Sequence, residues 1–233
     1  MRFTALTLSF ALALGCMPAT AGEKDREKNT ERLTDAADLM TEIMNTPDKS
    51  IPEDLLEKAN CIVIVPGLKK AAFVVGGKYG RGFALCRHPH GTPGWGPPAA
   101  VRIEGGGVGF QIGVSATDVV LLVMNERGMK KLASSKFTIG GDATATAGPV
   151  GRSASAQTDA YLHAEILSWS RARGLFAGVS LDGATLRNDM DENEIMYGQR
   201  WDNKQILGSG AKPPDAASKL LSLLNKYSPR EQK

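Results

Sequence analysis

The fold class of this 233-residue chain is decided by two long apolar stretches, CIVIVPGLKKAAFVVGGKYGRGFALC (Cys61–Cys86) and AAVRIEGGGVGFQIGVSATDVVLLVM (Ala99–Met124). Short runs rich in valine and isoleucine alternate with glycine or proline, which is typical of strands separated by turns. The predicted strands are Cys61–Val65, Ala71–Val75, Phe83–Cys86, Ala99–Ile103, Gly107–Val114 and Val119–Met124. Connections such as Pro66–Lys70 are too short for the helical crossovers of a parallel sheet. The pattern therefore predicts a mainly antiparallel sheet.

Helical periodicity surrounds this β-rich centre. Apolar residues recur at helical spacing from Glu31 to Met44, opposite a face rich in acidic residues. Further helices are predicted at Glu53–Asn60, Glu126–Ala133 and Asp215–Tyr227, and a second β region at Phe137–Leu162. Ala164–Arg171 fits a strand or a helix, and Leu175–Leu181 is typical of a buried strand. Together these elements predict an α+β fold.

The first residues predict export. Arg2 precedes an apolar run from Phe3 to Gly15 that is too short for a permanent membrane anchor, and we interpret Met1–Ala21 as a signal peptide. The alternative is a lipoprotein box ending at Cys16, which would anchor the chain through a lipid. The expected organisation is then a flexible leader at residues 22–30, one domain at residues 31–227 and a tail at residues 228–233.

Composition excludes some functions and leaves one covalent question open. The 28 lysines and arginines against 25 aspartates and glutamates give a formal charge of +3, so bulk charge does not indicate a nucleic-acid-binding protein. After cleavage at Ala21, Cys61 and Cys86 remain. An oxidising compartment would permit a disulfide between them, and two buried thiols are the alternative.

Several blocks of the sequence resemble the SYLF domain family. They occur in order, and Ile51–Gly76 is similar to the family's opening segment, so the resemblance covers about Glu31–Tyr197. The blocks are Glu104–Gly113, Phe137–Asp142 with Ala147–Arg152, and Arg173–Gly183. The resemblance implies a compact α+β domain with a strongly curved, mainly antiparallel sheet or barrel and peripheral helices. It also implies a binding module, because eukaryotic members bind phosphoinositides and some bind and bundle actin.

The best candidate site is a window without acidic residues, from Asn60 to Ile103. It contains the cations Lys69, Lys70, Lys78, Arg81, Arg87 and Arg102, interleaved with aromatic residues. Such a concentration suits a surface that meets phosphate headgroups while an aromatic ring lies at the membrane interface. The alternative is a set of solvated turn residues. We predict lipid-headgroup contacts for the first five of these cations, Lys69, Lys70, Lys78, Arg81 and Arg87.

Catalytic and metal-binding patterns are incomplete. Ser180 and Asp182 lack the second glycine of a nucleophile elbow, and no phosphate-binding loop is present. Cys86, His88 and His90 lack a second ligand group for zinc. The acidic run Arg187–Glu194 resembles the start of a calcium loop without its turning glycine, and we interpret it as a solvated turn. We therefore expect no enzyme activity, no cofactor and no metal.

These observations predict a periplasmic lipid-binding module of the bacterial envelope. The expected ligands are anionic lipids such as phosphatidylglycerol, cardiolipin or lipid A, since phosphoinositides are scarce in bacteria. Actin is not expected as a partner, because it is absent from that compartment. The alternative function is a structural or protein-interaction domain of the envelope without a specific lipid ligand.

Overall fold

A computed structural model of the chain describes residues 21–46, 50–88, 93–150, 164–172, 175–178, 181 and 183–229. Its sheet contains seven strands within these residues, in the order β3-β7-β2-β5-β4, with β1 paired to β2 and β6 paired to β5. The strands are β1 (Cys61–Cys86), β2 (Ala99–Val123), β3 (Lys136–Thr138), β4 (Ala145–Ala147), β5 (Ile166–Ala172), β6 (Leu175–Gly178) and β7 (Thr185–Asn188). The β4–β5 pair is parallel and the other pairs are antiparallel. The predicted α+β class with a mainly antiparallel sheet is confirmed.

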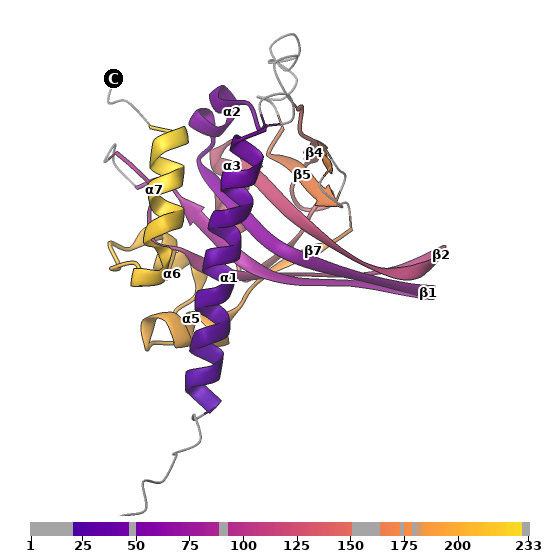
Figure 1. Cartoon of the computed structure of the whole chain (residues 1–233), viewed down its shortest axis with the longest axis horizontal. Helices are drawn as coiled ribbons and strands as arrows, with labels where there is room; N and C mark the ends of the chain where they lie inside the picture. The colour runs from indigo at the N-terminus through magenta and orange to yellow at the C-terminus, as the bar shows by residue number, and fades with distance from the viewer. Residues whose placement is uncertain are drawn as a thin grey trace, which may run out of the picture.

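The six short strands predicted in the central region are instead two long ones. β1 and β2 pair along nearly their whole length, from Cys61 opposite Val123 to Ala84 opposite Ala99. A straight strand of this length would span roughly 85 Å. The Cα atoms of Cys61 and Cys86 nevertheless lie 4.0 Å apart, so β1 turns back on itself and β2 turns with it. Figure 1 shows the resulting two-stranded ribbon projecting from the body of the molecule.

Two glycines allow the returning half of β1 to pack on its outgoing half. A Cβ atom at Gly82 would lie 2.0 Å from the carbonyl oxygen of Ile64, and one at Gly80 would lie 2.7 Å from Leu68 Cδ1. No side chain fits at such distances. The register also shifts between Val65 and Leu68, where Gly67 has a φ of 60°. A bulge at this point bends the outgoing half and accommodates Pro66, which has no N–H to donate.

The folded sheet buries apolar side chains on both faces. Ile62, Ile64, Phe83 and Leu85 belong to one core, which helices cover, whereas Val63 and other alternating residues belong to a second core inside the curve of the sheet. The helices on the first face are α1 (Ala21–Met44), α2 (Glu53–Lys58) and α7 (Ser218–Tyr227), the last preceded by the 3-10 turn η3 (Asp215–Ala217). The remaining helices are α3 (Glu126–Leu132), α5 (Met190–Tyr197) and α6 (Asn203–Gly208). No helix in the described residues is both long and apolar enough to cross a membrane.

Two sequence expectations differ from this structure. The segment at residues 22–30, expected to be a flexible leader, is part of α1. Its lysines, arginine and glutamates are good helix formers, and Asn29 is buried, where its amide donates to the carbonyl oxygen of Glu192. Leu175–Leu181, expected to be a buried strand, contributes the short strand β6 beside β5, and the side chain of Leu175 is 64% exposed. The ambiguous segment Ala164–Arg171 contributes the strand β5.

Candidate functional site

Three of the five predicted headgroup contacts lie together on the projecting part of the ribbon. Lys69 and Lys70 belong to the outgoing half of β1, and Lys78 belongs to the returning half. This part of the ribbon comprises residues 68–80 and 105–117, and we call it the distal ribbon. Its sequence contains these three lysines and no aspartate or glutamate. The distal ribbon therefore has a local charge of one sign on a molecule that is nearly neutral.

The doubling of β1 places the lysines of its two halves near each other. Gly80 packs on Leu68, so two residues further outward on each half Lys78 comes near Lys70. The methylene groups of Lys78 run across Gly105 of β2, where an added Cβ would lie 3.0 Å from Lys78 Cγ. The neighbouring Tyr79 is 46% exposed, and it is one of two large apolar or aromatic side chains with such exposure among the described residues. Tyr79 follows Lys78 in the strand, so its ring points to the opposite face of the ribbon, where its hydroxyl accepts a hydrogen bond from Arg81 Nε.

Arg81 lies at the base of the ribbon and is held by acidic residues. Its Nε is 3.0 Å from Asp189 Oδ2 and its Nη1 is 2.5 Å from Glu192 Oε1. Burial alone would lower the pKa of the guanidinium, but Asp189, the Tyr79 hydroxyl and Glu192 more than offset burial, so the pKa is raised. The predicted headgroup role of Arg81 is therefore not supported, because its charge is already neutralised inside the protein.

Arg87 is the clearest departure from the predicted site. Its side chain is buried, and its guanidinium donates to the carbonyl oxygens of Leu56, Glu57, Ala59 and Ser228. The guanidinium also lies 4.2 Å from the centre of the Trp95 ring. Arg87 thus joins the end of α2 to the residue after α7 and does not reach the surface. The prediction of a headgroup contact at Arg87 is wrong.

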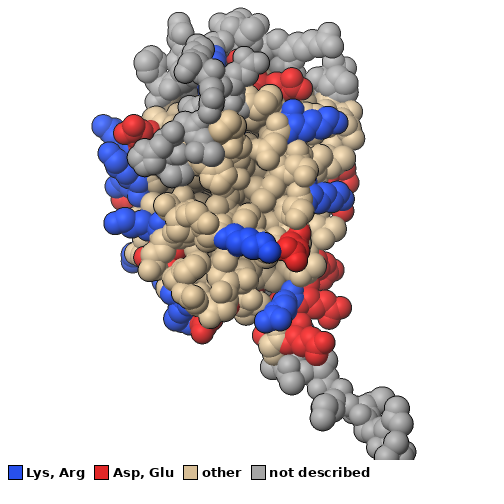
Figure 2. All heavy atoms as spheres, turned by 90° about the vertical axis from the view of Figure 1, so that its left-hand side faces the viewer, with Lys and Arg blue, Asp and Glu red and all other residues tan. Residues whose placement is uncertain are grey.

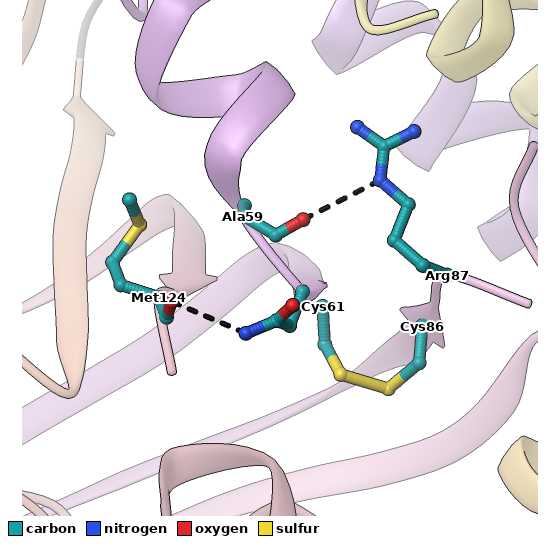
Figure 3. Close-up of a disulfide and its surroundings, with 6 residues drawn as sticks. Ala59, Cys61, Cys86, Arg87 and Met124 are labelled. Atoms are coloured by element: carbon teal, nitrogen blue, oxygen red, sulfur yellow. Dashed lines mark hydrogen bonds between the residues drawn. A yellow bond between two sulfur atoms is a disulfide. The ribbon is translucent and has the colours of Figure 1, made fainter. Parts of the chain in front are cut away.

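A disulfide joins Cys61 and Cys86 directly beside Arg87. Figure 3 shows the bond between the two ends of β1, with Arg87 directed away from it toward Ala59. The side-chain amide of Asn60 donates to the carbonyl oxygen of Met124. Of the two alternatives left open by the sequence, the structure contains the bridge. The sulfur of Cys86 is consequently not a metal ligand, and the described residues hold no cluster of three side chains suited to a metal ion.

The acidic run near the end of the sheet has a role that the sequence did not reveal. Asp189 is fully buried and Glu192 nearly so, and they lie in or next to α5 rather than in a solvated turn. Glu192 also pairs with Arg32 of α1, whose Nη1 lies 3.3 Å from Glu192 Oε2. These contacts tie α1, the ribbon base and α5 together. Nothing in the sequence linked Glu192 to Arg81, because the two residues are 111 positions apart.

The residues considered for catalysis add no site. Ser180 and Asp182 lie outside the described residues. Within the described chain, the carboxylates of Glu192, Asp189 and Asp118 are buried or half-buried, and each pairs with an arginine. In this part of the chain we identify no nucleophile paired with a base. The distal ribbon is therefore the candidate functional site, and it is suited to binding.

Comparison with known proteins gives consistent matches. The profile of the Ysc84 family, described as Las17-binding protein actin regulator, matches residues 104–227. Protein YSC84 of Saccharomyces cerevisiae is 34% identical over 180 residues, which cover 76% of this chain and 38% of that protein. The SH3 domain-containing YSC84-like protein 1 of Homo sapiens is 33% identical over 184 residues, covering 78% of this chain and 53% of that protein. The chain spans about half or less of the length of these relatives.

Proposed function

Since the chain belongs to the Ysc84 family, the Las17-binding protein actin regulators, we propose that it is a non-enzymatic lipid-binding module that engages anionic headgroups through Lys69, Lys70 and Lys78. The family match confirms the SYLF resemblance, and its description names a regulator rather than a class of enzyme. The observation that carries the proposal is the distal ribbon, which concentrates lysines without acidic residues on a projecting element.

The geometry of the ribbon suits contact with a membrane surface. A projecting element reaches a bilayer without requiring the body of the protein to approach it. Lys69 is exposed and Lys70 is partly exposed, so their ammonium groups are accessible to phosphate oxygens. The exposed ring of Tyr79 suits the interface between headgroups and acyl chains. With the distal ribbon on the membrane, the face of the protein covered by α1 and α7 would not contact the bilayer.

The proposed compartment is the bacterial periplasm, following the signal-like sequence Met1–Ala21. A lipid anchor at Cys16 remains the alternative route to the same membrane. In this compartment phosphatidylglycerol, cardiolipin or lipid A would supply the phosphate groups. The disulfide between Cys61 and Cys86 supports this location, because such bonds persist in oxidising compartments. We propose no actin partner there.

The test is the variant Lys69→Gln/Lys70→Gln/Lys78→Gln, measured by flotation with phosphatidylglycerol vesicles at low salt. Each lysine near an anionic surface contributes about 1 kcal/mol, so the dissociation constant should rise by roughly a hundredfold. The matched control changes the exposed residues Lys204, Lys212 and Lys226 to glutamine, which removes the same charge from the helical side. Equal losses in the two variants, or equal binding of wild type to neutral vesicles, would contradict the proposal.

The same experiment addresses the alternative of an envelope protein-interaction domain. Such a domain would not bind protein-free vesicles, whatever their charge. Absence of wild-type binding to every anionic vesicle would therefore favour a protein partner and overturn the lipid-binding proposal.

A further inference from the structure

A groove runs between α1 and the base of the ribbon, on the side where β5 ends. It has a volume of about 610 Å³, and its walls include Glu31 and Asp35 of α1, Gly67 of β1, Asp118 of β2 and Arg171 of β5. Arg171 lies in one wall, where its Nη2 is 2.8 Å from Asp118 Oδ2. Arg171 also pairs with Glu42 of α1. The groove is therefore a preformed hollow with charged walls.

The charge of the groove is acidic, and part of it is unbalanced. Five acidic and three basic residues line the groove. Each of the three bases is already ion-paired: Lys28 with Asp25, Arg32 with Glu192, and Arg171 with Asp118 and Glu42. Within the described residues, neither Glu31 nor Asp35 has an ion pair or a hydrogen bond through its carboxylate. These two side chains lie four residues apart, one turn apart on the same face of α1.

The pKa of Asp118, at the base of the ribbon, reflects the position of Asp35 in the groove. Burial raises the pKa of Asp118, and the nearby charge of Asp35 raises it further, whereas the hydrogen bond from the Gly67 N–H lowers it. Asp35, Asp118 and Gly67 are therefore close in space. Figure 2 shows that acidic side chains also gather at the lower right, where the described chain begins with α1.

Lys69 and Lys70 of the distal ribbon lie near the edge of this groove. Lys69 follows Gly67 by two residues, so their Cα atoms are about 7 Å apart along the strand. Within the described residues, Lys69 and Lys70 make no ion pair and no side-chain hydrogen bond. Lys69 and Lys70 are consecutive residues of β1, so their side chains leave the ribbon on opposite faces. Among the described residues, two lysines and two carboxylates without ion pairs therefore adjoin on one molecule.

We infer that this mixed surface binds a second copy of the chain, with one lysine of the pair Lys69 and Lys70 of each copy placed against Glu31 and Asp35 of the other. A two-fold interface brings one patch against the identical patch of its partner, so it requires a patch that is complementary to itself. Adjacent basic and acidic halves satisfy this requirement. A second copy of the chain is the proposed partner because it carries the cations that the acidic half requires. A basic peptide or a polyamine would fill only the acidic half.

The inference is tested by sedimentation velocity at about 0.01 M salt, where the Debye length is about 30 Å. Wild type should form a dimer that dissociates as salt rises. The variants Glu31→Lys/Asp35→Lys and Lys69→Glu/Lys70→Glu should each dimerise at least tenfold more weakly, because every contact becomes one between like charges. Mixing the two variants should restore association, since one patch is then wholly basic and the other wholly acidic.

The control is Glu53→Lys/Glu57→Lys, which reverses two exposed acidic residues at the same spacing on α2 and should leave dimerisation unchanged. A wild-type monomer at every concentration would overturn the inference. So would a dimer that survives both charge reversals, because its interface would lie elsewhere. Vesicle flotation separates this result from the lipid proposal: the Glu31→Lys/Asp35→Lys variant should lose the dimer and still bind anionic vesicles.

Discussion

Gly82 shows how one residue without a side chain determines the path of the ribbon. An added Cβ would lie 2.0 Å from the Ile64 carbonyl oxygen and 2.7 Å from Val65 Cα, and both of these are backbone atoms that a rotamer change does not relieve. The returning half of β1 therefore depends on glycine here. Sequence alone indicated turns between short strands at the glycines of this region. It did not distinguish the glycines in contact from those in open space.

The replacement Gly82→Ala should lower the free energy of unfolding by at least about 2 kcal/mol, because the clash separates the two halves of β1. The matched control is Gly77→Ala on the same strand, where the nearest atom to an added Cβ is the Gly105 carbonyl oxygen at 3.8 Å. This control should change stability by less than about 1 kcal/mol. Urea denaturation followed by circular dichroism measures both. Equal stabilities would mean that the halves of β1 are not packed at Gly82.

The buried position of Arg87 could not be predicted from the number of cations in the sequence. The acid-free window of the sequence treated six cations as equivalent, but the structure separates three exposed or partly exposed lysines from arginines with internal roles. A planar guanidinium satisfies several carbonyl oxygens at once, which suits Arg87 for the junction of α2 and the chain end. The arginines of this window make contacts within the protein, whereas its lysines lie on the distal ribbon. Nothing in the local sequence separated these uses.

At the scale of elements, the two long strands were harder to predict than the helices. The positions of α1, α2, α3 and α7 followed from periodicity, and α3, which begins at Glu126, agreed with its prediction at that end, whereas α5 and α6 were not predicted. The strands were divided too often, because glycine and proline usually interrupt strands. Here they produce bulges and a bend within continuous strands, as the register around Gly67 shows. The continuity depends on pairing between β1 and β2, which are distant in sequence.

The disulfide holds the two ends of the doubled strand β1 together. It closes a segment with a sequence separation of 25 residues, and such a loop is expected to stabilise a domain by about 3 kcal/mol through the unfolded state. The variant Cys61→Ala/Cys86→Ala should therefore unfold at a lower urea concentration than oxidised wild type. Reductant should shift wild type toward the variant and leave the variant unchanged. If reductant leaves wild type unchanged as well, the bridge does not contribute to stability.

At the scale of the whole molecule, the fold class followed from sequence because strand-rich and helix-rich segments are clearly separated. The candidate site was only partly predictable. Lys69, Lys70 and Lys78 were identified by their number and lack of acidic neighbours, but their meeting on one projecting ribbon results from the doubling of β1. The groove was missed because it combines residues from α1, β1, β2 and β5. Its parts are up to 143 residues apart, between Lys28 and Arg171.

The lipid surface and the proposed dimer surface share Lys69 and Lys70, which couples the two activities. A lysine paired with the groove of a second copy does not contact a phosphate, so dimerisation should compete with membrane binding. With anionic lipid in large excess at low salt, the vesicle-bound fraction of wild type should fall as protein concentration rises through the dimerisation range. The Glu31→Lys/Asp35→Lys variant should show no such fall. Co-sedimentation with vesicles over a protein dilution series measures this. The same concentration dependence in both proteins would show that the dimer does not cover the lysines.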